Sequence, residues 1–109
     1  MTEQQPCCTL VPELNDQEIG HIASIFHLLG DAGRLQLVLA CIDTPKSVAQ
    51  LSARCGMSQP LTSHHLRQLR EARVLKSERQ GKQIFYTLQD FHIRHVILDL
   101  ASHVKEPIQ

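Results

Sequence analysis

The stretch SVAQLSARCGMSQPLTSHHLRQLREARV, residues 47–74, decides the fold of this chain. Ser47 is a good N-cap for a short helix, which Gly56 ends. Ser58 caps a second helix, which tolerates Pro60 in its first turn. Two short helices joined by a tight glycine-containing turn, the second rich in polar and basic side chains, are typical of a helix-turn-helix.

The second helix of this pair has an apolar side and a polar side. Its apolar side is expected to bury Leu61, Leu66 and Leu69. The residues expected to face outward are Gln59, Thr62, Ser63, His64, Arg67 and Arg70. Glutamine, serine and histidine side chains pair with base edges in the major groove of DNA. The alternative is a solvated basic helix face. Catalysis by Ser63 with its neighbouring histidines is disfavoured, because no third group that would orient a base is visible.

Residues 74–88 alternate apolar and polar side chains around Gly81, which predicts a two-stranded hairpin with basic residues at its tip. A basic hairpin that follows a helix-turn-helix is a wing, placed to lie along the DNA backbone or minor groove. The expected DNA contacts of helix and wing together are Ser58, Gln59, Thr62, Ser63, His64, Arg67, Arg79, Gln80 and Lys82.

The distribution of charge agrees with a nucleic-acid partner, although the formal net charge of the 109 residues is zero. Residues 58–83 hold six basic and two acidic side chains, a net charge of +4, so the rest of the chain carries −4. Such a basic patch suits a protein that touches phosphates with one face. No apolar run reaches membrane-span length and the start does not resemble a signal peptide, so we expect a cytoplasmic protein without a membrane partner.

The last helix is expected at residues 90–106, with the sequence DFHIRHVILDLASHVKE. Its polar stripe contains what look like two halves of a metal site, namely Asp90 with His92 and His103 with Glu106. The two histidines are 11 positions apart, about three turns, so they share a face but lie roughly 16 Å apart along the axis. Zinc–ligand bonds of about 2 Å cannot bridge that gap. Two antiparallel copies can close the site, which predicts a homodimer with a pair of equivalent sites. The alternative is a solvated helix face.

Further helices are expected from about residue 15 to Gly30 and from Asp31 to residue 42, which gives about five helices in all. The fold class is therefore mainly α (α+β): a winged helix-turn-helix with a two-stranded β-wing, forming a homodimer packed through the first and last helices. The expected domain spans residues 15–106, between tails at 1–14 and 107–109.

Three stretches together resemble the ArsR/SmtB family of winged-helix, metal-responsive transcriptional repressors: LGDAGRLQLVLAC at 29–41, the helix-turn-helix at 47–75 and ERQGKQIFYTLQD at 78–90. The resemblance covers roughly residues 19–106 and includes the family's D-x-H…H-x-x-E motif in the last helix. It implies a repressor, not an enzyme, with no small organic substrate. The metal-free dimer is expected to bind operator DNA, and metal binding to release it from genes for metal efflux or sequestration. It also implies that His103 hydrogen-bonds to the main chain at Arg73, which would link metal to the recognition helix.

Two imidazoles and two carboxylates suit four-coordinate Zn(II), and Ni(II) or Co(II) on the same scaffold is the alternative. The thiolate site of other family members is not expected, because Ser47, Ala49 and Gln50 stand at its positions. A different alternative is a thiol-based redox or persulfide-responsive repressor that uses Cys41 with Cys7 or Cys8. A third alternative, a zinc enzyme or metal-buffering protein that does not bind DNA, would leave the basic hairpin unexplained.

Overall fold

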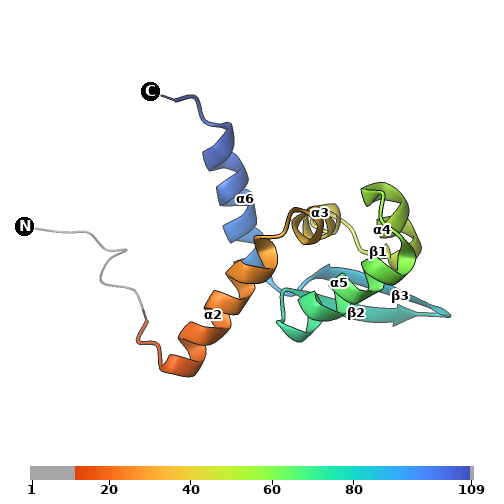
Figure 1. The fold of residues 1–109 in the computed structure, drawn as a ribbon, viewed down its shortest axis with the longest axis horizontal. Coiled ribbons are helices and arrows are strands. Elements are labelled where there is room, and N and C mark those ends of the chain that lie inside the picture. Colours follow the sequence, from red (N-terminus) through yellow and green to blue (C-terminus); the bar gives the residue numbers. More distant parts are fainter. Residues whose placement is uncertain (1–11, 109) are drawn as a thin grey trace, which may run out of the picture.

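The computed structural model describes residues 12–108, which form five helices and three strands. The helices are α2 (Asp16–Leu29), α3 (Ala32–Ala40), α4 (Val48–Cys55), α5 (Gln59–Glu71) and α6 (Phe91–Lys105), and the strands are β1 (Lys46–Ser47), β2 (Leu75–Gln80) and β3 (Gln83–Leu88). The predicted winged helix-turn-helix is confirmed: α4 and α5 form the helix pair, and β2 and β3 form the wing (Figure 1). The thiols of Cys7 and Cys8 lie outside the described residues.

The helices begin at the capping residues that the sequence predicts. Asn15 and Ser47 each form a reciprocal capping box with the residue three positions on. Asp31 accepts a hydrogen bond from the Arg34 N–H, and this bond holds the pKa of the Asp31 carboxyl below its usual value. Local side-chain chemistry therefore fixes where each helix starts.

The sheet is antiparallel with the order β1–β3–β2. In the wing, Leu75 pairs with Leu88 at one end and Gln80 pairs with Gln83 beside the turn. Gly81 at that turn adopts a φ of 65°, which glycine tolerates without strain. The predicted two-stranded wing is present as β2 and β3, and the sheet also contains a third, two-residue strand, β1, which pairs with β3. A two-residue strand leaves no alternating pattern in the sequence, so the prediction missed it.

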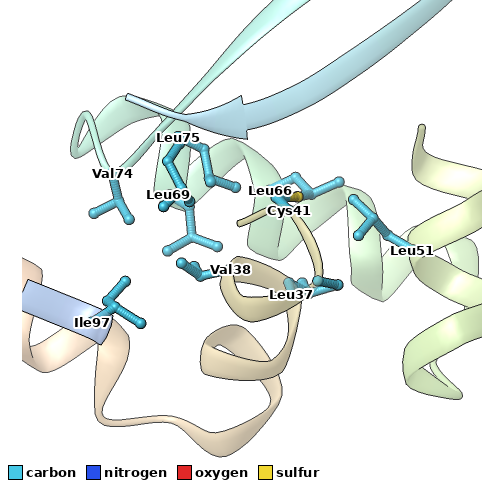
Figure 2. Close-up of a cluster of buried hydrophobic side chains, with 11 residues drawn as sticks. Leu37, Val38, Cys41, Leu51, Leu66, Leu69, Val74, Leu75 and Ile97 are labelled. Atoms are coloured by element: carbon cyan, nitrogen blue, oxygen red, sulfur yellow. The ribbon is translucent and has the colours of Figure 1, made fainter. Parts of the chain in front are cut away.

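The core joins α3, α4, α5 and the sheet (Figure 2). Its fully buried side chains include Leu37 and Val38 of α3, Leu51 of α4 and Leu66 and Leu69 of α5. Val74, Leu75 and Cys41 complete the fully buried apolar set, and Ile97 of α6 reaches the edge of the core. The second helix of the helix-turn-helix, α5, is the recognition helix of this fold, and it is held by apolar packing within one chain.

Two predictions for α5 were wrong, and both follow from the register of the helix. Thr62, expected outward, is fully buried, and its hydroxyl donates to the Ser58 carbonyl at 2.8 Å. It lies four residues before Leu66 and seven before Leu69, so it belongs to the buried stripe. Leu61 falls on another side of the helix and is 44% exposed, although it was expected to be buried.

The helices α2 and α6 lie on one side of the molecule, and α4, α5 and the wing lie on the other (Figure 1). The radius of gyration is 16.4 Å, larger than the roughly 13 Å of a compact domain of about 100 residues. Across the described chain, α2 contains no buried residue and α6 contains one, Ile97. No single helix among residues 12–108 is long and apolar enough to cross a membrane, and α2 with α3 reach that length and composition only when joined across a 93° bend.

Candidate nucleic-acid interface and metal-ligand residues

The outward face of α5 begins at its N-terminus. Ser58 caps the helix through its side-chain oxygen, which accepts the Leu61 N–H at 3.3 Å. Beyond the cap, the side chains of Gln59, Ser63, His64 and Arg67 are exposed. These are the types of side chain that read base edges and neutralise phosphates, and the positive end of the helix dipole lies on the same side.

The burial of Thr62 removes this residue from the face that the sequence analysis assigned to DNA. Its hydroxyl is already engaged with the Ser58 carbonyl, where it supports the first turn of the helix. The exposed face of α5 is therefore one residue smaller than predicted.

The tip of the wing carries the second group of predicted contacts. Arg79, Gln80 and Lys82 are exposed on either side of Gly81. The Nε of Arg79 donates to the Gly81 carbonyl at 3.3 Å, which holds the guanidinium close to the turn. Arginine and lysine at the tip of a hairpin can contact phosphates of a DNA backbone that the body of the protein does not reach.

Within residues 12–108, the basic residues of α5 and the wing form no ion pair. Between residues 12 and 108 the one ion pair within 4.0 Å joins Arg94 to Asp43, far from the wing tip. The charges of Arg67, Arg79 and Lys82 are therefore not neutralised by carboxylates of the described chain. Such charges bind phosphates with release of counterions.

The four predicted metal ligands lie at the two ends of α6. Asp90 is the N-cap, with one carboxylate oxygen accepting the Ile93 N–H at 3.1 Å, and Glu106 is the C-cap. His92 and His103 lie on the exposed surface of the helix between them. Since α6 is continuous from Phe91 to Lys105, the rise between the two histidines is about 16 Å. In one copy of residues 12–108, no three histidine, cysteine, aspartate or glutamate side chains come together as a metal site.

An apolar groove of about 470 Å³ lies beside α6, between α2, α3 and α6. Phe26 and Leu39 line it from one side, and Val96, Leu100 and Val104 line it from α6. All five side chains are large and exposed in the single chain, with Val104 reaching 79%. A continuous exposed apolar surface of this kind marks an interaction site.

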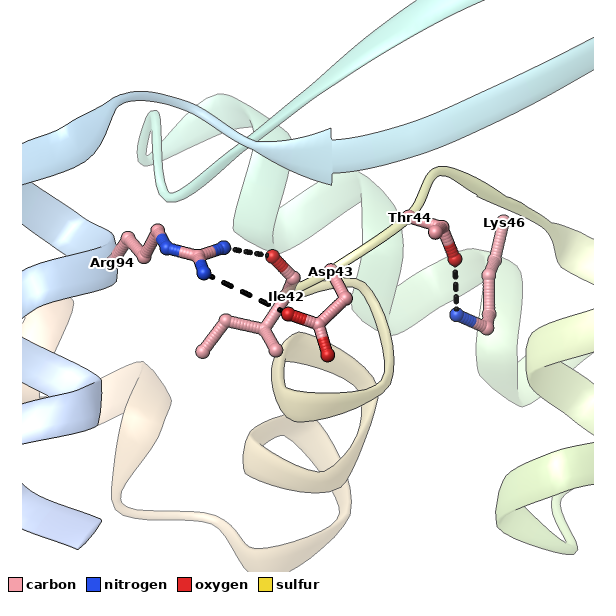
Figure 3. Close-up of polar contacts among 5 residues, drawn as sticks. All are labelled: Ile42, Asp43, Thr44, Lys46 and Arg94. Carbon is pink, nitrogen blue, oxygen red and sulfur yellow. Dashed lines mark hydrogen bonds and ion pairs between the residues drawn. The ribbon is translucent and has the colours of Figure 1, made fainter. Parts of the chain in front are cut away.

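The first turns of α6 are attached to the body through Arg94 (Figure 3). Its guanidinium donates to the main-chain carbonyl of Ile42 and forms an ion pair with Asp43 at 3.7 Å. Together with Ile97, this contact holds the Asp90 and His92 end of α6 against the end of α3. The C-terminal end of α6 extends away from the body (Figure 1).

His21, which is not among the predicted site residues, contacts the end of α5. The Nε2–H of His21, on α2, donates to the main-chain carbonyl of Ala72 at 2.9 Å. Ala72 is the C-cap of α5, and the next residue, Arg73, has a φ of 63°. No local pattern links two residues 51 positions apart, so the sequence carried no signal of this contact. The predicted bond from His103 to Arg73 stays a prediction.

The two described cysteines have protected thiols. Cys41 is fully buried, and this burial raises the pKa of its thiol to about 11. Burial also raises the pKa of Cys55, which is half-buried. Both groups are protonated near neutral pH, and the thiol form is a poor nucleophile.

This fold, with an exposed polar face on α5 and an unpaired basic wing, defines a winged helix-turn-helix DNA-binding protein. The family profile described as "Bacterial regulatory protein, arsR family" matches residues 31–77. The chain is 35% identical over 92 residues to the HTH-type transcriptional regulator KmtR of Mycobacterium tuberculosis. The aligned residues cover 84% of this chain and 71% of KmtR. It is 32% identical over 100 residues to the HTH-type transcriptional repressor SmtB of the same species, covering 91% and 74% of the two chains.

A solved structure gives the same result in three dimensions. The transcriptional repressor BigR from Xylella fastidiosa superposes with a TM-score of 0.73 at 27% identity, over 84% of this chain and 94% of BigR. The chain belongs to the ArsR family of bacterial transcriptional regulators. The resemblance that the sequence motifs indicated is confirmed, and the protein is a DNA-binding repressor of the ArsR/SmtB type.

Proposed function

We propose that this protein is a metal-responsive repressor whose metal-free homodimer binds operator DNA and releases it when Zn(II) binds between the two α6 helices. The observation that carries the proposal is the placement of four ligand-type side chains at the two ends of one straight, exposed helix. Residues 15–106 form the working unit, and the cytoplasm is its place of action.

The positions of the four ligands fit a twofold axis. The ligands are arranged symmetrically about one point of α6, next to Ile97. This point is midway between His92 and His103 and nearly midway between Asp90 and Glu106. Two antiparallel copies that cross there bring Asp90 and His92 of one subunit next to His103 and Glu106 of the other. Two equivalent donor sets follow from one crossing.

The apolar groove supports the same pairing. The side chains of Val96, Leu100 and Val104 recur every four residues along α6 and are exposed in the single chain. A second copy of α6 and α2 would cover them, since a patch of this chemistry is unfavourable in water. The polar stripe and the apolar stripe of α6 therefore point to one interface.

The donor set fits a borderline metal ion. Bound Zn(II) supplies a four-coordinate link between two subunits and needs no redox chemistry. In the chain itself, Asp90 keeps one carboxylate oxygen free of its capping bond, and His92, His103 and Glu106 are exposed. Ni(II) or Co(II) sensing on the same residues is the second candidate, because imidazole and carboxylate ligands bind all three ions.

A thiol-based switch that uses Cys41 is less well supported. The raised pKa and full burial of Cys41 leave little thiolate to react with an oxidant or persulfide. Its proposed partners Cys7 and Cys8 lie outside the described residues, so the structure supplies no argument for that pairing.

The proposal is tested by metal titration of DNA binding with His103→Ala and a matched control, His95→Ala, on the same helix. The probe is a duplex that the metal-free wild-type protein enriches from a random pool. His103→Ala is expected to keep metal-free binding and to lose release by Zn(II), because its side chain is remote from α5. His95→Ala should respond like the wild type. Parallel titrations with Ni(II) and Co(II) rank the three ions.

Two outcomes contradict the proposal. Loss of metal-free DNA affinity in His103→Ala would place this residue in the reading surface instead of the sensor. Ions held by isolated subunits in sedimentation, with no dimer, would remove the shared sites.

A further inference from the structure

The contact between α2 and the end of α5 is built from a directional bond. Because a carbonyl oxygen only accepts, the Nε2 of His21 carries the hydrogen that it donates to Ala72 at 2.9 Å. The carbonyls of the last turn of a helix have no partner within the helix, so this bond satisfies an otherwise free group of α5. Gln68, four residues before the C-cap, accepts the Ala72 N–H in the ordinary helical manner.

The accepting turn is itself rigid. The Val74 N–H donates to the Leu69 carbonyl at 2.9 Å and the Arg73 N–H donates to the Arg70 carbonyl at 3.0 Å, which together make a Schellman-type helix end. Arg73 takes the left-handed conformation that this motif requires. Val74 and Leu75 then enter the core and start the wing. A side chain that holds Ala72 therefore holds both α5 and the base of the wing.

The donating side chain belongs to the helix that leads away from the body. On α2, His21 lies on the same stripe as Ile25 and Leu28, which are half-buried against the core. Ile22 and Phe26 lie on a different side of the helix and are exposed. His21 is one turn further from the body than Ile25, and its bond extends the attachment of α2 up to that turn.

We infer that His21 is a positioning residue that fixes the angle between the dimer-forming helix α2 and the recognition helix α5, and thereby the half-site spacing that the dimer accepts. The inference rests on the proposed function, since it requires a dimer that binds DNA. The two recognition helices of a dimer must reach successive major-groove faces, about 34 Å apart. A helix of 14 residues is about 21 Å long, so a small change in its angle moves a recognition helix by several ångströms.

The test compares spacing preference in His21→Ala, His21→Gln and a matched control, His27→Ala, an exposed histidine on the same helix. The probes are the duplex selected by the metal-free wild-type protein and the same duplex with one or two base pairs inserted between the half-sites. Affinities are measured by fluorescence anisotropy. Melting temperatures are recorded for every variant.

For His21→Ala we expect about a fivefold loss of affinity on the selected duplex, the size of one net hydrogen bond, and a smaller loss on the spaced duplexes. The ratio of affinities between the two spacings should fall accordingly. His21→Gln should restore the ratio, because its side-chain amide can donate to the same carbonyl. His27→Ala should match the wild type.

An unchanged ratio in His21→Ala would overturn the inference, and so would an equal loss of affinity on all duplexes, because a loss of stability alone acts on every DNA equally. A wild-type protein that sediments as a monomer, or that enriches no duplex, would overturn the proposed function instead. The two failures are thus separate observations.

Discussion

The half of the molecule that reads DNA and the half that would sense metal are built in opposite ways. The helix pair α4–α5 and the wing are closed around fully buried side chains such as Leu51, Leu66 and Leu75. In the other half, no residue of α2 is buried in the described chain, and Ile97 is the single buried residue of α6. The reading unit can therefore fold on the contacts of one chain, whereas α2 and α6 present apolar surfaces that we propose a second copy covers.

This difference gives a physical reason for a switch. A tightly packed unit keeps its shape. In a dimer, the affinity for DNA would therefore depend mainly on how the two reading units are placed relative to each other. The helices α2 and α6 have few buried contacts of their own, so a change in how two copies pack against each other breaks few contacts within one subunit. The four proposed metal ligands and the exposed apolar stripe lie on α6.

Truncation in the closed half should have the largest effect. Leu66→Ala removes a fully buried side chain from the centre of the core, and we expect the free energy of unfolding to fall by about 2–5 kcal/mol. Urea unfolding followed by circular dichroism measures the loss. The control is Leu100→Ala in the open half, where a side chain 52% exposed should cost far less in dilute protein. Equal losses from both changes would mean that the two halves are not built differently.

A charge placed in the open half should act on association and leave the fold of the subunit intact. Leu100→Asp is expected to weaken self-association by about a hundredfold or more, because an unpaired carboxylate buried in an apolar interface is costly. Sedimentation equilibrium measures the change, and the helical signal should persist since Leu100 supports no core contact in one chain. An unchanged dimer would remove the groove beside α6 from the interface.

The same division explains how much the sequence predicted. Caps such as Ser47 and Ser58, and the apolar spacing of α3 to α6, are local signals, and the helices and wing were predicted correctly from them. The pairing of β1 with β3 and the hydrogen bond from His21 to Ala72 join segments far apart in the chain, and no local sequence pattern predicts either contact.

The errors within α5 have a different cause. The burial of Thr62 and the exposure of Leu61 reverse what polarity alone suggests. Their positions relative to Leu66 and Leu69 decide the outcome, because helix register places Thr62 on the buried stripe. The assignment of Asp90, His92, His103 and Glu106 as metal ligands stays a prediction, since their proposed partners belong to another copy.

The smallest effect should appear at high pH and belongs to the closed half. The pKa of Cys41 is about 11 in the fold, above the ordinary value of 9.0 that applies to the unfolded chain. Below pH 9 the thiol is protonated in both the folded and the unfolded chain, so its ionisation does not lower the free energy of unfolding. As the pH rises from 9 to 11, the unfolded chain loses the proton while the folded chain keeps it, so unfolding becomes more favourable.

The stability advantage of the wild type over Cys41→Ala should therefore shrink between pH 9 and 11, and urea unfolding at several pH values measures this difference. Cys55→Ala is the matched control, because Cys55 is only half-buried and its alkaline loss should be smaller. Iodoacetamide at pH 8 should leave Cys41 of the native protein largely unmodified, since little thiolate is present. Rapid labelling of Cys41 would show that the core opens readily, which would break the contrast between the two halves and revive the thiol-based alternative.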